Sequence, residues 1–188
     1  IKYEKQVEKK DRKKSAGINQ LKEILNMPEI KRIECYDISN TSGVQSVGSM
    51  VVFEDGHPNP KEYRKFKIKT IEGPNDYGSL KEVLTRRFKN GIKELEKGNT
   101  TTGFGNMPDL ILMDGGKGQV SSALEIINEF KLDIEIAGLV KDDKHTTRAI
   151  IYQGEEIFIK RSEPVYKLIY EIQEEAHRFA INYHRKLM

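Results

Sequence analysis

The sequence predicts a single α/β domain built around a mixed sheet of five strands, flanked by helices and carrying one small extra hairpin. Three observations support this. Apolar, β-branched runs at residues 32–38, 47–53 and 62–68 follow one another with turn residues between them, as in antiparallel strands. Further on, strand-like runs at 109–113 and 134–140 alternate with helical periodicity, as in parallel βαβ units. A chain of 188 residues can bury one substantial core.

The amino-terminal part differs in character from the rest. Residues 1–16 are charged and predict a solvated helix or tether, and residues 18–26 have the apolar spacing of a short helix. We therefore expect residues 1–29 to be a charged helical lead-in and residues 30–188 to form the domain. Since the first residue is Ile1 and not Met, the chain is expected to be an excised fragment.

Three more helices and the small hairpin follow from the spacing of apolar residues. A long helix is expected from Asn75 to about Gly98, a second over 117–130, and a last one from about Ser162 to the end. Between the last two helices, residues 149–152 and 156–159 flank Gln153-Gly154 and predict the small extra hairpin.

Composition excludes several classes of protein. Charged residues make up 32% of the chain and no apolar run approaches the ~18 residues of a membrane span, so a soluble protein without membrane association is expected. No secretory signal is visible, and the single cysteine, Cys35, lies in an apolar strand where it would pack as a small hydrophobe. A reducing cytoplasm fits these features.

Two aspartates stand where strands end. Asp37 precedes a polar turn, and Asp114 follows four apolar residues and precedes a glycine-rich turn into a helix. The predicted element order is that of ribonuclease H, in which the first and fourth strands are parallel neighbours. Both carboxylates would then meet at one sheet edge and could share a Mg²⁺ or Mn²⁺ ion, which prefers oxygen ligands.

Simpler explanations exist for each acid taken alone. Aspartates often end strands and cap turns, and only the predicted topology makes catalysis the better reading of this pair. An apolar strand ending in Asp114 also resembles a Walker B motif, but the chain contains no phosphate-binding loop of the G-x-x-x-x-G-K-[ST] type. Gly116-x-Gly118 is a broken dinucleotide fingerprint, because Ser121 stands where its last glycine should be.

Several blocks together resemble the carboxyl-terminal catalytic half of the UvrC family, the incision subunits of bacterial nucleotide excision repair. The blocks are YDISN at 36–40, NDY at 75–77, MDGGKGQ at 113–119, Lys141-Asp142 with His145, and EAHRFAI at 175–181 with His184-Arg185. They run in the family's order from about residue 30 to the end.

The resemblance implies a ribonuclease H-like endonuclease that cuts on the 5′ side of a DNA lesion. It implies a divalent metal held by Asp37, Asp114 and His177, with Asp76 as a further acid of the same incision. It also implies damaged double-stranded DNA as substrate and UvrB as partner, with UvrA acting upstream. Neither the family's GIY-YIG nuclease half nor its helix-hairpin-helix repeat is present in this sequence.

The histidines and basic residues leave alternatives open. His177 lies about 140° around its helix from Ile172, off the apolar stripe, which suits either a solvated face or a metal ligand or proton-transfer group. His145 is the second candidate for that role, and Asp76 could simply cap its helix. Candidate DNA contacts, against a background of ordinary surface charge, are Lys117, Lys141, His145, Arg148, Arg178, His184 and Arg185.

Two other functions remain open at this point. The domain could be a non-catalytic ribonuclease H-like module that binds DNA or protein, or a nuclease of the same fold acting on RNA–DNA hybrids. Both differ from the first reading in substrate or chemistry rather than in fold, so the fold alone does not distinguish them.

Overall fold

The computed structural model describes residues 2–39, 46–70 and 75–187, with side chains up to residue 182. Its helices are α1 (Lys2–Leu25), α2 (Asp76–Glu96), α3 (Lys117–Glu129) and α4 (Pro164–Leu187), with single 3₁₀ turns at Pro60–Glu62 and Gly103–Gly105. Its strands are β1 (Arg32–Ser39), β2 (Val47–Glu54), β3 (His57–Pro58), β4 (Arg64–Lys67), β5 (Leu110–Met113), β6 (Glu135–Lys141), β7 (Thr147–Tyr152) and β8 (Glu155–Phe158).

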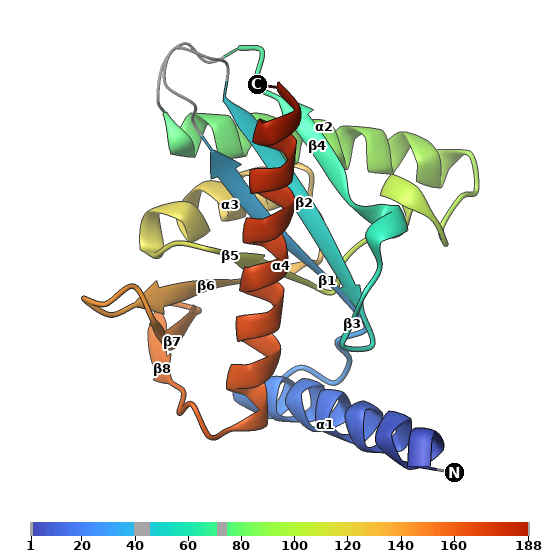
Figure 1. Ribbon diagram of the computed structural model, residues 1–188. Coiled ribbons are helices and arrows are strands. Elements are labelled where there is room, and N and C mark those ends of the chain that lie inside the picture. The colour runs from blue at the N-terminus through green and yellow to red at the C-terminus, as the bar shows by residue number, and fades with distance from the viewer. Residues whose placement is uncertain (1, 40–45, 71–74, 188) are drawn as a thin grey trace.

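All these strands belong to one mixed sheet, ordered β3-β2-β1-β5-β6-β7-β8, with β4 also paired to β2 (Figure 1). β1 is antiparallel to β2 and parallel to β5, and β5 is parallel to β6. The predicted ribonuclease H order, with the first and fourth predicted strands adjacent and parallel, is therefore confirmed.

The sheet is larger than the five strands predicted. The extra hairpin does not stand apart, because β7 pairs with β6 and extends the same sheet. The expected return arm at 62–68 is the shorter strand β4, and the turn before it contains β3 and a 3₁₀ turn, where Pro58 and Pro60 cannot donate to a strand ladder. The polar turn after Ser39 lies outside the described residues.

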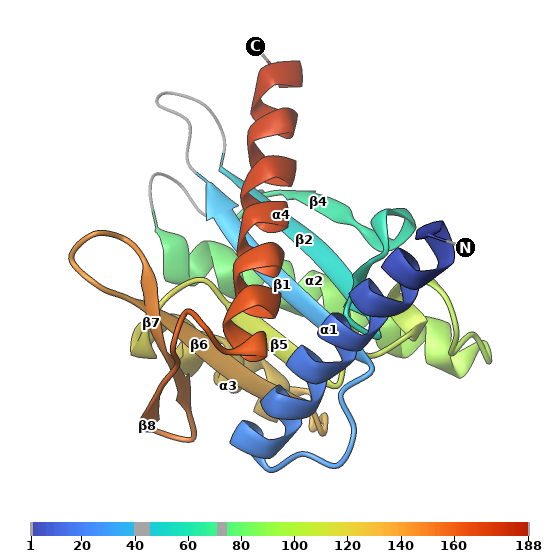
Figure 2. The same ribbon diagram turned by 60° about the horizontal axis from the view of Figure 1, so that its bottom comes forward.

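Helices cover both faces of the sheet. α2 and α3 lie on one face, and α4 crosses the other with α1 packed against its beginning (Figure 2). A strand exposes alternate side chains to opposite faces, so Glu34 and Tyr36 of β1 face α2 while Cys35 and Asp37 face α4. Cys35 is buried, as predicted.

α1 is one continuous helix, which confirms the solvated helix expected at the start of the chain and joins it without a break to the short helix expected at 18–26. Its first three turns are exposed, and its last two bury Ile18, Leu21 and Leu25 in the same core as the strands. None of the helices in the described part of the chain combines the length and apolar character that a membrane span requires.

Candidate active site

Asp37 and Asp114 are neighbours at one edge of the sheet. The parallel register of β1 and β5 pairs Cys35 with Leu112 and Tyr36 with Met113, and one residue further it reaches the two aspartates. Residues in parallel register point to the same face, so both carboxylates face α4. A tight turn follows Asp114, and Gly138 on β6 makes room for it, because a Cβ at Gly138 would lie 2.7 Å from the Gly115 carbonyl oxygen.

The pKa of Asp37 is shifted by several charged groups that the fold brings near its carboxylate. Burial and then the neighbouring carboxylate of Asp114 raise the pKa of Asp37 to about 6, while His177 and Lys141 act in the opposite direction. Asp76 adds a smaller upward effect on the same pKa. Residues distant in sequence are thus within electrostatic reach of one carboxylate.

The carboxylate of Asp114 is held by two side chains. The Lys141 ammonium lies 3.1 Å from Oδ1 and 3.2 Å from Oδ2, and the Gln173 amide nitrogen donates to Oδ1 at 3.2 Å. The Thr147 hydroxyl donates in turn to the Gln173 oxygen at 2.8 Å. Lys141 sits at a β-bulge between Val140 and Lys141, a device that re-aims a side chain.

A cleft of about 410 Å³ opens beside Asp114, between α4 and the β6–β7 turn. It is lined by Asp114, Lys141, His145, Thr146, Thr147, Tyr166, Tyr170, Gln173, Glu174 and His177. His177 is exposed there and off the buried face of α4, as predicted. A smaller hollow of about 80 Å³ contains Asp37, Asp76, Asp114 and Gln119, so Asp114 borders both spaces.

Asp76 stands at the start of α2, exposed and beside this small hollow. The helix cap is its neighbour Asn75, whose Oδ1 accepts from the Gly78 amide at 3.0 Å. The structural role weighed for Asp76 therefore belongs to Asn75.

Three other predicted site residues, Lys117, Arg148 and Arg178, do not line the cleft or the small hollow. Lys117 begins α3 and lines neither space. Arg148 pairs with Glu156 at 3.4 Å and covers the Phe158 ring, and Arg178 pairs with Glu175 one helical turn earlier. The side chains of His184 and Arg185 lie outside the described residues.

The donor set suits a divalent cation in part. Two adjacent carboxylates offer hard oxygen ligands, and their mutual repulsion would be relieved by a positive ion. Within residues 2–39, 46–70 and 75–182, however, no three Asp, Glu, His or Cys side chains are close enough to share one metal. The predicted ligand set Asp37, Asp114 and His177 therefore remains a prediction, with the two aspartates as its better supported part.

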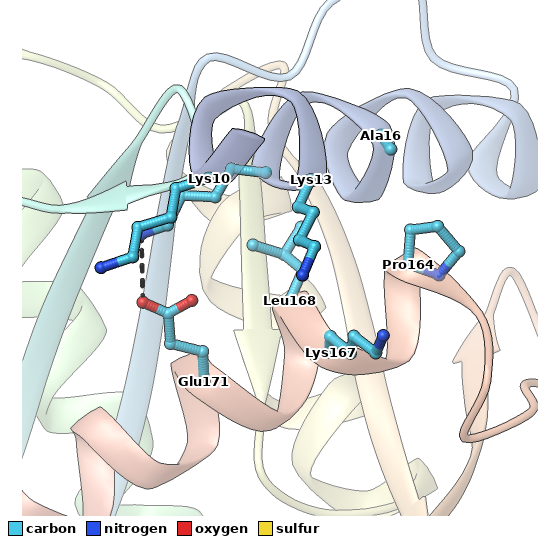
Figure 3. A pocket seen from close by; sticks show the side chains of 8 residues that line it. Lys10, Lys13, Ala16, Pro164, Lys167, Leu168 and Glu171 are labelled. Atoms are coloured by element: carbon cyan, nitrogen blue, oxygen red, sulfur yellow. Dashed lines mark hydrogen bonds and ion pairs between the residues drawn. The ribbon is translucent and has the colours of Figure 1, made fainter. Parts of the chain in front are cut away.

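A second hollow, of about 420 Å³, lies on the other flank of α4, against α1 (Figure 3). Lys10 and Lys13 of α1 face Lys167 and Glu171 of α4 across it, and Lys14 pairs with Glu171 at 3.2 Å. Neither aspartate borders this hollow, so the chemistry points to the cleft beside Asp114.

Most of the chain is similar in sequence to known proteins. The family model described as the UvrC RNase H endonuclease domain matches residues 22–181. The chain belongs to this family. The match includes Asp37, Asp76, Asp114 and His177, and the strand order agrees with the fold that the family's name states.

Curated relatives of this UvrC domain support the same family membership. The UvrABC system protein C of Finegoldia magna is 60% identical over 95% of the chain, and that of Lachnospira eligens is 52% identical over 96%. The chain spans only 29% and 30% of those two proteins.

Among solved structures, human endonuclease V matches 85% of the chain and 87% of its own length with 13% identity and a TM-score of 0.44. Endonuclease V of Ciona intestinalis in complex with DNA covers 85% of this chain and 88% of its own length at 12% identity, with a TM-score of 0.48.

Sequence reasoning missed six residues that line the cleft: Thr146, Thr147, Tyr166, Tyr170, Gln173 and Glu174. A signal for two of them was available, since Tyr170 and Gln173 lie seven and four residues before His177, on the same face of its helix. Thr147 offered no comparable signal, because its place depends on the register of β7 against β6.

Proposed function

We propose that this chain is the metal-dependent DNA endonuclease domain of an excision-repair nuclease, cutting a strand of damaged duplex DNA on the 5′ side of the lesion. The observation that carries the proposal is the adjacency of Asp37 and Asp114 at one sheet edge, within a family of endonuclease domains. The relatives' name, UvrABC system protein C, supports UvrB as a partner and UvrA as an upstream component.

Asp37 and Asp114 would hold a Mg²⁺ or Mn²⁺ ion. When bound, such an ion activates water and offsets charge on a phosphate. Burial, followed by the repulsion of the neighbouring Asp114 carboxylate, raises the pKa of Asp37 to about 6, and a cation held between the two acids would favour its charged form.

The other groups act around these acids. We assign His177, which lines the cleft beside Asp114, a role at the reacting phosphate, as proton-transfer group or third metal ligand. Lys141 and His145 stand in the same cleft and would contact phosphate oxygens. Gln173 and Thr147 keep the Asp114 carboxylate in place.

Replacing Asp114 tests the proposal. In the full-length protein with its repair partners, Asp114→Asn should lower the rate of 5′ incision on the order of 10³-fold, because several kcal/mol of transition-state stabilisation are lost. The reaction should also stop in EDTA and resume with Mg²⁺ or Mn²⁺.

A matched control lies at the other end of the same strand. Asp109 accepts hydrogen bonds from the amides of Lys31 and Arg32 at 2.8 and 2.9 Å, and so ties down a loop. A folded Asp109→Asn variant should cut normally. Normal 5′ incision by Asp114→Asn, or incision that persists in EDTA, would refute the assignment.

A further inference from the structure

One face of α4 carries a stripe that the core does not explain. Tyr166, Tyr170, Gln173 and His177 recur at helical spacing and all line the cleft beside Asp114. The stripe is aromatic near the start of the helix and polar toward the acids. Tyr166 packs partly on the core, whereas Tyr170, one turn later, is 55% exposed. Leaving so large a ring in water forgoes burial energy that a ligand would recover.

The opposite wall of the cleft is formed by the β6–β7 turn and carries His145 and Lys141, whose ammonium pairs with Asp114. Asp142 accepts hydrogen bonds from the amides of Lys144 and Thr146 at 2.9 and 3.0 Å, and closes the β6–β7 turn. His145 sits in this turn with a φ of 61°, a strained backbone position for a non-glycine residue. The turn thus holds His145 on the cleft, close to Lys141.

The cleft therefore joins an aromatic wall on α4, which also carries Glu174, to a wall that carries Lys141 and His145, with Asp114 between them. At about 410 Å³ it is far larger than a metal ion needs and falls within the size range of sites for small organic groups. A nucleotide matches both walls, because it has a flat π-face and a charged phosphate. A base inside a duplex has both faces covered by its neighbours, so only an unstacked base could use the exposed ring.

We propose that this cleft binds one unstacked nucleotide next to the phosphate that is cut, with its base on the ring of Tyr170 and its phosphate toward Lys141 and His145. The inference rests on the proposed nuclease function and adds to it a requirement on the substrate. The DNA must be locally open at the position of incision as well as at the lesion.

A double-mutant cycle between the ring and the base tests this. The full-length protein, assembled with its partners in EDTA so that no strand is cut, is titrated with lesion-containing duplex. The nucleotides within two positions of the incised bond are replaced, one at a time, by abasic residues. Wild type and Tyr170→Phe should each lose about tenfold in affinity at one position, the amount expected for one base stacked on an aromatic ring.

The variant without the ring should behave differently. Tyr170→Leu should bind intact DNA about tenfold more weakly and lose nothing further at that abasic position, which defines a coupling between ring and base. Tyr3→Leu, at a tyrosine that is 77% exposed on α1, is the control and should match wild type. Thermal unfolding verifies folding, and Tyr170→Gln replaces the leucine variant if that one aggregates.

The outcomes separate this inference from the nuclease assignment. Wild-type affinity of Tyr170→Leu, or equal losses for all proteins at every abasic position, would overturn the subsite. Asp114→Asn should keep the ring–base coupling while losing incision. If no coupling between ring and base is measured, the nucleotide subsite is refuted and the nuclease assignment is unaffected. Normal incision by Asp114→Asn would refute the nuclease assignment, whatever coupling is measured.

Discussion

Glu34 and Asp37 lie three residues apart on β1, yet their carboxylates have opposite surroundings. Glu34 faces α2 and is fully buried, and Arg87 contacts both its oxygens at 3.1 and 2.8 Å. Arg32 at 3.0 Å and the Tyr36 hydroxyl at 2.6 Å complete the cluster. Asp37 faces α4, and the charged neighbour with the largest effect on its pKa is a second acid, Asp114.

The two acids show two uses of a buried carboxylate. Burial alone would raise the pKa of Glu34, but Arg87 and Arg32 lower it below its ordinary value. Burial and Asp114 together raise the pKa of Asp37 to about 6. One side of the strand is therefore neutralised within the fold, and the other leaves negative charge that a cation from outside would neutralise.

The largest expected effect comes from breaking the neutralised side. Arg87→Met should lower the free energy of unfolding by about 3–5 kcal/mol, because it leaves the buried charge of Glu34 without its main partner. The guanidinium of Arg87 also donates to the carbonyls of Phe104 and Asn106 at 2.6 and 2.9 Å, so a loop is released as well. Urea denaturation measures the change.

The adjacent residue provides the control. Arg86 is about one-third exposed, pairs with Glu82 at 3.5 Å, and donates to the Lys67 carbonyl at 2.7 Å. Arg86→Met should therefore cost about 1 kcal/mol or less. Equal losses for the two variants would show that the buried cluster has no special weight.

The same contrast explains what the sequence could predict. Asp37 and Asp114 were found because strand ends and glycine turns are local signals, and the strand order followed from the alternation of elements. The ion pair of Glu34 and Arg87 was not predicted, because Arg87 sits between Leu84 and Phe88 on a helix and nothing in the local sequence distinguishes it from a surface arginine. Its pairing depends on how α2 packs on the sheet.

The elements predicted from the sequence were also divided incorrectly at two places where tertiary contacts determine the structure. The first turns of α1 are exposed and bury no apolar side chain, yet the helix continues unbroken because its last turns are anchored by Leu21 and Leu25 in the core. Likewise the hairpin of β7 and β8 looked separate, since pairing with β6 depends on register and not on composition.

A smaller effect should come from the side that carries the two adjacent acids, Asp37 and Asp114. The raised pKa of Asp37 means that the folded state holds a proton more tightly than the unfolded state, so stability falls as pH rises from about 4 through 6. In EDTA, Asp37→Asn should stabilise the protein by about 2 kcal/mol at pH 8 and by little at pH 4. Thermal and urea unfolding across pH measure this.

Glu34 provides a second test, because its pKa is shifted in the opposite direction from that of Asp37. Its lowered pKa contributes stability that is present above pH 4.5 and is lost as pH falls through the folded-state value. Glu34→Gln should therefore destabilise the protein, and more at neutral pH than in acid. Destabilisation of the protein by Asp37→Asn at pH 8 would contradict the interpretation that the two acids repel each other.

The smallest expected effect concerns the hydrogen bonds that orient Asp114. A carboxylate only accepts, so Gln173 must turn its nitrogen to Asp114 and its oxygen to Thr147, whose buried hydroxyl donates to it. Thr147→Val keeps the shape and removes that donor, which lets the amide reverse and set an oxygen against the carboxylate. We expect kcat for incision about tenfold lower, equivalent to one hydrogen bond of about 1.4 kcal/mol, with the KM for DNA unchanged. Thr147→Ser retains the hydroxyl and should restore the rate, whereas a changed KM at constant kcat would mean that Thr147 serves DNA binding instead of the orientation of Asp114.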